Sequence, residues 1–171
     1  MLIVKLLICI CILEITTYIG IMLGRELKNR TKEYVKLQSI CTYIEGRIKY
    51  SQDNLIDIFE DVCKENKDNN FGKLFKDITY EMKKNIYSLN ECISRGISNN
   101  QYRFSSDFGI LLELSNNLGK SNVENQIKAI ELAKERIVEK ITESRVIESK
   151  NTKLYRNLGV ICGIMLVIVL I

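Results

Sequence analysis

The C-terminal end of the chain constrains the fold more than any other stretch, because it contains no charged side chain. From position 158 to the end the sequence reads LGVICGIMLVIVLI. A helix that crosses a bilayer needs about 20 apolar residues, and adding Leu154 and Tyr155 brings this stretch close to that length. Arg156 would then extend its side chain to the lipid headgroups beside Tyr155. We therefore predict a transmembrane helix over 154–171; a buried C-terminal core helix is the alternative.

The predicted span continues a long amphipathic helix that starts near position 121. Gly119 can end a preceding helix in the left-handed conformation, and Ser121 can cap the next helix, with Glu124 completing a capping box. Apolar residues then recur at the spacing of one helix face: Val123, Ile127, Ile130, Ala133, Ile137 and Ile141. No glycine or proline interrupts the run before Gly159. Whether helix and span form one rod or two pieces hinged near Arg156 stays open.

A second apolar stretch, from Leu2 to Leu23, is also long enough to span a bilayer. A cleaved signal peptide is the alternative, but its apolar region would be unusually long and no cleavage-site pattern follows, which favours a retained anchor. Basic residues follow this span and precede the C-terminal one, so the middle of the chain is predicted to face the cytoplasm. We predict a transmembrane helix over 1–24, a cytoplasmic helical bundle over 25–153 and a C-terminal transmembrane helix over 154–171.

Glu14 lies near the middle of the first predicted span. An ionised, unpaired carboxylate in lipid costs about 3 kcal/mol on insertion scales. Glu14 is therefore predicted to be protonated, paired or turned toward another helix. The functional hypothesis is a contact inside an assembly, for example with another copy of the chain. The alternative is a protonated side chain that bonds a backbone carbonyl or Thr17.

Between the spans the sequence predicts an all-α fold, namely a six-helix bundle flanked by the two transmembrane helices. The first helix continues from the N-terminal span, and Ser51 is expected to cap the second. Ser88 and Glu91 form a capping box for a short fourth helix, and the polar segment 96–103 is expected to be the longest loop. A fifth helix starts at Ser105 or Ser106, and the run from Ser121 is the sixth. No useful stretch alternates with a period of two, which argues against a sheet.

The composition argues against most enzymatic chemistry. The sequence contains no histidine, the commonest general base and zinc ligand. Its six cysteines lack a C-x-x-C pair and are predicted to be small buried hydrophobes rather than metal ligands or disulfides. No glycine-rich phosphate loop is present, and no acidic pair lies in a pocket-like context. We therefore expect no catalytic, metal-binding or cofactor-binding residues; a membrane hydrolase or transferase is the remaining enzymatic alternative.

Charged residues are interspersed, with a net charge of +4, which does not indicate nucleic-acid binding. Tyrosines at helical spacing are more often core or rim aromatics than a base-stacking surface. Lysines on the predicted third helix form a candidate partner-facing basic face for an acidic cytoplasmic protein, with a solvated face as the alternative: Lys73, Lys76, Lys83 and Lys84.

This layout resembles the stage III sporulation protein AB family of endospore-forming bacteria over nearly the whole chain. The most specific parts are the sequence LGKS at 118–121, which is followed by Glu124 and Gln126, and the sequence KLYRNLGV at 153–160, which includes Tyr155, Arg156 and Gly159. These motif residues, Gly119 and Ser121 among them, look structural: a cap, a helix junction and a membrane entry. Where family members commonly have proline before Leu55, this chain has Asn54.

The family is similar to the cytoplasmic domains of type II secretion platform F proteins. The resemblance implies a non-enzymatic platform component of the channel between mother cell and forespore. Its expected partners are a cytoplasmic ATPase, the companion AA protein, and other membrane proteins of the complex. The implied location is the mother-cell-derived outer forespore membrane, with the bundle in the cytoplasm. A membrane-tethered adaptor or sensor is the alternative, and formation of a homo-oligomer stays open.

Overall fold

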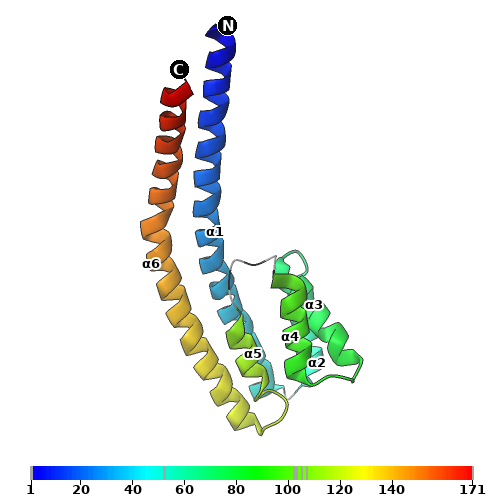
Figure 1. Ribbon diagram of the computed structural model, residues 1–171. Helices are drawn as coiled ribbons and strands as arrows, with labels where there is room; N and C mark the ends of the chain where they lie inside the picture. The colour runs from blue at the N-terminus through cyan, green and yellow to red at the C-terminus, as the bar shows by residue number, and fades with distance from the viewer. Residues whose placement is uncertain (1, 52, 102–103, 105, 107, 171) are drawn as a thin grey trace. The chain divides into compact units, whose positions relative to one another are not determined.

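The structure of the protein is a computed structural model that describes residues 2–51, 53–101, 104, 106 and 108–170. The described residues form six helices, listed here in chain order (Figure 1): α1 (Leu2–Tyr50), α2 (Leu55–Glu65), α3 (Asn70–Lys83), α4 (Leu89–Asn100), α5 (Gly109–Ser115) and α6 (Val123–Leu170). This part of the chain contains no strand. The prediction of an all-α protein with six helices is therefore confirmed.

The chain divides into two compact units, each containing part of α1 and part of α6. One unit comprises residues 1–32 and 142–171, and the other comprises residues 33–141. The boundaries between these units, at 32/33 and 141/142, reflect packing within the protein. The predicted boundaries at 24 and 154 refer to a membrane surface instead, and they stay predictions.

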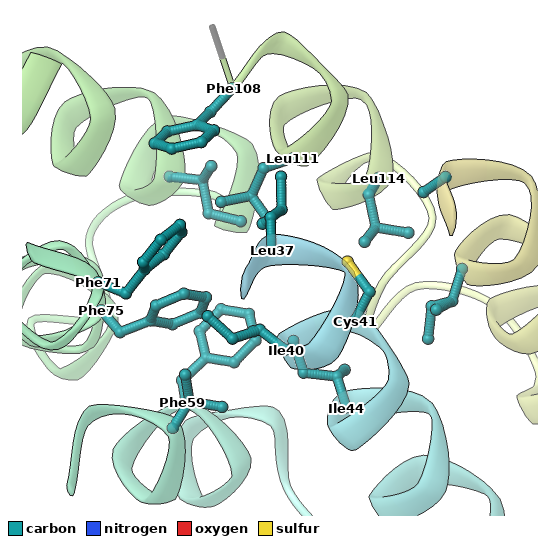
Figure 2. Packing of buried hydrophobic residues seen from close by; sticks show 14 of the residues in the cluster. Leu37, Ile40, Cys41, Ile44, Phe59, Phe71, Phe75, Phe108, Leu111 and Leu114 are labelled. Carbon is teal, nitrogen blue, oxygen red and sulfur yellow. The ribbon is translucent and has the colours of Figure 1, made fainter. Parts of the chain in front are cut away.

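The unit of residues 33–141 is organised around one apolar core. The second half of α1 contributes Leu37, Cys41 and Ile44, which recur at helical spacing and are almost completely buried. Figure 2 shows these side chains facing a group of phenylalanines and the leucines of α5. Phe59 of α2 meets Phe75 of α3 edge-on, with ring centroids 5.2 Å apart. Burying one such side chain contributes roughly 1.5–3 kcal/mol, so this core holds the helices together.

Local signals at helix starts succeed at some positions and fail at others. The Ser88–Glu91 capping box is present as predicted: the Ser88 hydroxyl accepts a hydrogen bond from the Glu91 N–H, and the Glu91 carboxylate accepts one from the Ser88 N–H. The prediction that Ser51 caps α2 is wrong. The Ser51 N–H still donates to the Arg47 carbonyl as a continuation of α1, and Asn54 holds the N-cap position. Asn54 has φ of −65°, the value that proline imposes, so a proline at this position would fit the same backbone φ.

The predicted loop over 96–103 is wrong in its first half. Helix α4 continues through Gly96 to Asn100, and Arg103 lies outside the described residues. Gly96 is buried against Ile78 of α3, where an added Cβ would be too close to the Ile78 side chain. This glycine therefore permits close helix packing and does not break a helix.

The predicted start of the fifth helix is also too early. Helix α5 begins at Gly109, with Phe108 at the N-cap, whereas Ser106 precedes the helix and Ser105 lies outside the described residues. Phe108 is buried and packs edge-on against Phe104, with centroids 4.7 Å apart. Phe108 thus packs in the core, at a position where the sequence predicts the first turn of the helix.

In the other unit, the N-terminal part of α1 and the C-terminal part of α6 run antiparallel and in close contact. A Cβ added at Gly20 would lie 2.6 Å from the Tyr155 carbonyl oxygen, and one at Gly159 would lie 2.6 Å from the Thr16 carbonyl oxygen. Both distances are shorter than any ordinary Cβ contact, so only glycine fits at these two positions. Small residues spaced four apart are the usual means by which helices approach closely in a membrane.

Candidate interaction surfaces

The turn before α6 brings together several of the motif residues. Gly119 has φ of +71°, in the left-handed region where glycine is favoured, as predicted. Its N–H donates to Gln126 Oε1 at 3.0 Å, and Gln126 Nε2 donates to the Ser121 carbonyl at 2.8 Å. Gln126 therefore ties the turn to the first turns of the helix that follows, a role that the sequence did not indicate.

The capping assignment at the start of α6 is wrong by one residue. Asn122 Oδ1 accepts the hydrogen bond of the Asn125 N–H at 3.0 Å, which is the contact expected of an N-cap. Ser121 instead donates its hydroxyl to the Asn117 carbonyl at 3.0 Å, and Glu124 pairs with Lys128 one turn along α6. Ser and Asn are equally good caps, so the sequence alone did not separate these adjacent positions.

Gly119 and Gln126 also form part of the wall of an open pocket of about 610 Å³, between the start of α2 and the start of α6. The remaining wall residues combine apolar side chains with two carboxylates: Ile48, Asp53, Asn54, Leu55, Ile56, Asp57 and Val123. Among the wall residues that the structure describes, no serine, threonine or cysteine lies beside these carboxylates.

The C-terminal motif residues lie in the antiparallel helix pair. Gly159 faces α1 at the close contact described above, and Tyr155 is half-buried with its carbonyl oxygen beside Gly20. Arg156 is exposed. Helix α6 is unbroken from Val123 through these residues to Leu170, so the backbone has no hinge near Arg156.

Helices α1 and α6 are both long and apolar enough to cross a membrane, judged by length and composition. Only 11% of the most apolar window of α1 and 6% of that of α6 are buried within the protein. That exposure does not fit the alternative of a buried C-terminal core helix, whose side chains would be enclosed.

Glu14 lies on α1 with an exposed side chain. Among the residues that the structure describes, none forms a hydrogen bond or an ion pair with Glu14. The predicted alternative of a bond between Glu14 and Thr17 is not formed within the described residues. The neighbouring Thr16 hydroxyl donates to the Ile12 carbonyl at 3.0 Å.

The four lysines of the predicted basic face are all exposed on one side of α3, but they are not equivalent. Lys83 forms an ion pair with Glu60 of α2, and Lys84 pairs with Glu81 at 2.6 Å. Neither Lys73 nor Lys76 forms an ion pair within the described residues. The net positive charge of this face therefore comes mainly from Lys73 and Lys76.

A groove of about 270 Å³ runs beside this face, between α2 and α3. Its walls are Glu60, Cys63, Lys64, Lys76, Thr79, Tyr80 and Lys83. Tyr80 is exposed, and the Lys84 ammonium lies over its ring, 4.3 Å from the centroid. The groove therefore combines an exposed aromatic side chain with cationic groups.

Arg47, a residue that the sequence did not indicate, joins the end of α1 to the following segment and to α2. Its guanidinium donates to Asp53 Oδ2 at 2.7 Å and to Asp61 Oδ2 at 2.9 Å, and it donates to the Tyr43 hydroxyl at 2.7 Å. Hydrogen bonds from Lys64 and Arg47 hold the pKa of Asp61 below its usual value. The network fixes the α1–α2 connection, and Asp53 also lines the pocket between the starts of α2 and α6.

The prediction that the six cysteines are small buried hydrophobic residues holds only in part. Cys9, Cys41 and Cys92 are buried, Cys63 is half-buried, and Cys11 and Cys162 are exposed on the long helices. Burial raises the pKa of the Cys41 thiol to about 12, so this residue is an inert core side chain. Within the described ranges no group of acidic or cysteine side chains is arranged to hold a metal ion.

These features define an all-α protein of six helices, two of which are long and have apolar ends. The family model described as Stage III sporulation protein AB matches residues 5–171, and the chain therefore belongs to this family of sporulation proteins, which is not known to be enzymatic. None of the curated proteins compared with the sequence matches it.

A solved structure described as Stage III sporulation protein AB has a similar fold, with a TM-score of 0.64. The match covers 71% of this chain and 98% of that chain, at 16% sequence identity. At this identity the likeness concerns the fold alone. The helical architecture is thus shared with that protein.

Proposed function

We propose that this protein is a non-enzymatic platform component of a secretion-like channel between mother cell and forespore, needed for endospore formation. In this role it couples a cytoplasmic ATPase to membrane partners. Membership of the sporulation family supports a role in endospore formation. The observation that carries the mechanism is the continuity of α6, which contributes Ile130 and Ile137 to the bundle core and continues without a break to its apolar end.

The proposed arrangement is a two-pass protein of the outer forespore membrane, with the bundle on the mother-cell cytoplasmic side. The apolar, outward-facing ends of α1 and α6 support membrane insertion. The close glycine contacts between them support insertion as a hairpin, because small residues allow van der Waals packing where no hydrophobic force drives association. Basic residues flank both apolar segments on the bundle side, which supports this orientation.

The ATPase contact is proposed for the α2–α3 groove and the adjacent basic face. Lys73 and Lys76 supply cations that form no ion pair among the described residues, and exposed Tyr80 supplies an aromatic contact. A partner related to the companion AA protein would then present an acidic surface here. Replacing Lys73 and Lys76 by Glu should reduce ATPase binding. Replacing Lys120 by Glu, an exposed lysine before α6 that forms no ion pair within the described residues, should leave that binding unchanged.

The rival function is a membrane-tethered adaptor that only recruits a cytoplasmic protein. An adaptor would function with any membrane anchor, whereas a platform requires its own transmembrane helices to contact membrane partners. We expect that exchanging both spans for unrelated apolar helices leaves the bundle at the membrane and the ATPase bound, but abolishes spore formation. Normal spore formation by the exchanged protein would instead favour the adaptor.

A further inference from the structure

We propose that the outward face of α1 around Glu14 docks a transmembrane helix of a different protein, one that carries a basic side chain at the depth of Glu14. This inference rests on the proposed function, because it presumes that the apolar ends of α1 and α6 lie in a membrane. It adds to that function the location and the chemistry of the intramembrane contact.

The two faces of α1 in this segment are distinct. The inner face, which meets α6, carries Cys9, Leu13, Thr16, Gly20 and Gly24, at intervals of three and four residues. Because each residue turns the helix by about 100°, Glu14 lies about 120° away from the centre of that face. The chain's own second span therefore cannot reach the Glu14 carboxylate.

The outer face is apolar except near Glu14. Ile10, Tyr18 and Ile21 lie within one or two turns of Glu14 on the same side of the helix, and all three are exposed. Tyr18 is 62% exposed and places a phenol one turn from the carboxylate. A carboxylate and a phenol on an otherwise apolar helix face give a partner helix both area to bury and polar groups to pair.

A second copy of the chain does not complete this face. Glu14 is the only charged residue between positions 6 and 24, and the only charged side chain of the second span, Arg156, lies at its headgroup end. Two copies with the same orientation would place Glu14 opposite Glu14. The nearest cation in helix α1 is Lys5, nine residues away, which is about 13 Å along the axis at 1.5 Å per residue. A shift of that size would move one apolar segment out of register with the bilayer.

The remaining way to keep an ionised Glu14 in the membrane is a cation from another protein. Intramembrane ionisable residues pair with one another or face the interior of an assembly. Charge complementarity therefore selects a lysine or arginine on the docking helix, and the outer face of α1 supplies the apolar contact around it.

The test uses the full-length chain in membranes of sporulating cells, with a photo-crosslinking amino acid in place of Tyr18. The matched control places the same crosslinker at Met165, which is 63% exposed on α6 and has no charged neighbour in its span. Protease protection of the two ends first establishes that each variant is inserted. We expect the Tyr18 position to capture a heterologous membrane protein whose span contains a basic residue, identified by mass spectrometry.

Changes at Glu14 then distinguish pairing from mere proximity. Glu14→Leu and Glu14→Lys should lower the yield of the crosslinked protein captured from position 18 about tenfold, the fold-change of a lost intramembrane polar contact. Glu14→Asp should retain most of that yield. Combining Glu14→Lys with an acidic replacement of the partner's basic residue should restore the product.

Several results would overturn the inference. These are a product between two copies of this chain, a captured span without a basic residue, no protein product at Tyr18, or a product insensitive to all Glu14 variants. A chain that is not inserted at all would refute the proposed function itself. The protection assay separates that failure from a failure of the docking inference.

Discussion

Two glycines in helices of the bundle lead to opposite predictions for the same substitution. Gly46 lies in α1 with open space where a Cβ would be, whereas Gly96 lies in α4 against Ile78. Alanine in a helix interior is more favourable than glycine by about 0.5–1 kcal/mol. Gly46→Ala should therefore raise the free energy of unfolding of the bundle by about that amount.

At Gly96 the same gain is opposed by a clash. The added Cβ would meet Ile78 Cγ1, which lies next to the backbone of α3, and it would lie 3.5 Å from the Ile78 backbone nitrogen. Overpacking of this kind costs about 1–3 kcal/mol. The net effect of Gly96→Ala is then between neutral and about 2 kcal/mol destabilising, and the two variants should differ by about 1–3 kcal/mol.

Pulse proteolysis of the detergent-solubilised full chain across a urea series measures both variants. The double variant Gly96→Ala with Ile78→Ala provides an internal check, because removing the Ile78 side chain should relieve the clash and make the two changes cost less together than separately. If Gly96→Ala stabilises the bundle as much as Gly46→Ala does, the close approach of α3 and α4 is incorrect.

Three further predictions concern the turn, the helix pair and the surface charges. Gln126→Ala should lower the free energy of unfolding by about 1–2 kcal/mol through loss of two hydrogen bonds, measured by the same pulse proteolysis, while Asn125→Ala should have little effect; equal effects would contradict the assigned role. Gly20→Leu should separate the two long helices and reduce disulfide formation between cysteines placed on their facing sides, whereas unchanged disulfide yield would show that they do not meet there. Because hydrogen bonds from Lys64 and Arg47 lower the pKa of Asp61 in the folded state, its stabilising effect is present above its unfolded pKa and is lost as the pH falls below about 4. Asp61→Asn should flatten this acid dependence of urea unfolding, and an unchanged profile would mean that the pairings of Asp61 with Lys64 and Arg47 are not formed.

The parts of the fold that could be predicted are those fixed by neighbours in sequence. The Ser88–Glu91 box succeeds because both partners lie within one turn and no distant contact is needed. The continuation of the first helix beyond the N-terminal span also succeeds, because apolar residues such as Leu37, Cys41 and Ile44 recur at the spacing of one helix face. By contrast, Ser121 and Asn122 are adjacent residues with similar capping ability, and only the surrounding turn decides between them.

The failures concern contacts between residues distant in sequence. Gly96 resembles a helix breaker until Ile78 is known to lie against it. The ion pairs of Lys83 and Lys84 reduce the charge of the predicted basic face, and single-sequence reasoning does not reveal them all, since Glu60 lies on another helix. Arg47 was missed for the same reason.

The helix pair did leave a signal in the sequence. Gly20 and Gly24 are four residues apart in the first apolar stretch, and Gly159 and Gly163 are four apart in the second. This spacing is typical of closely packed membrane helices. It indicates which faces of α1 and α6 meet, and Glu14 lies outside the face of α1 that carries Gly20 and Gly24.

The central claim is that α6 transmits movement between the bundle and the membrane, and one insertion tests it directly. A flexible Gly-Ser segment placed after Ser149 interrupts α6 between its core residues and its apolar end. The matched control places the same segment after Asn85, in the turn between α3 and α4. With protein level, membrane insertion and ATPase binding unchanged in both variants, we predict loss of spore formation only for the insertion in α6. Normal spore formation with that insertion would contradict the claim.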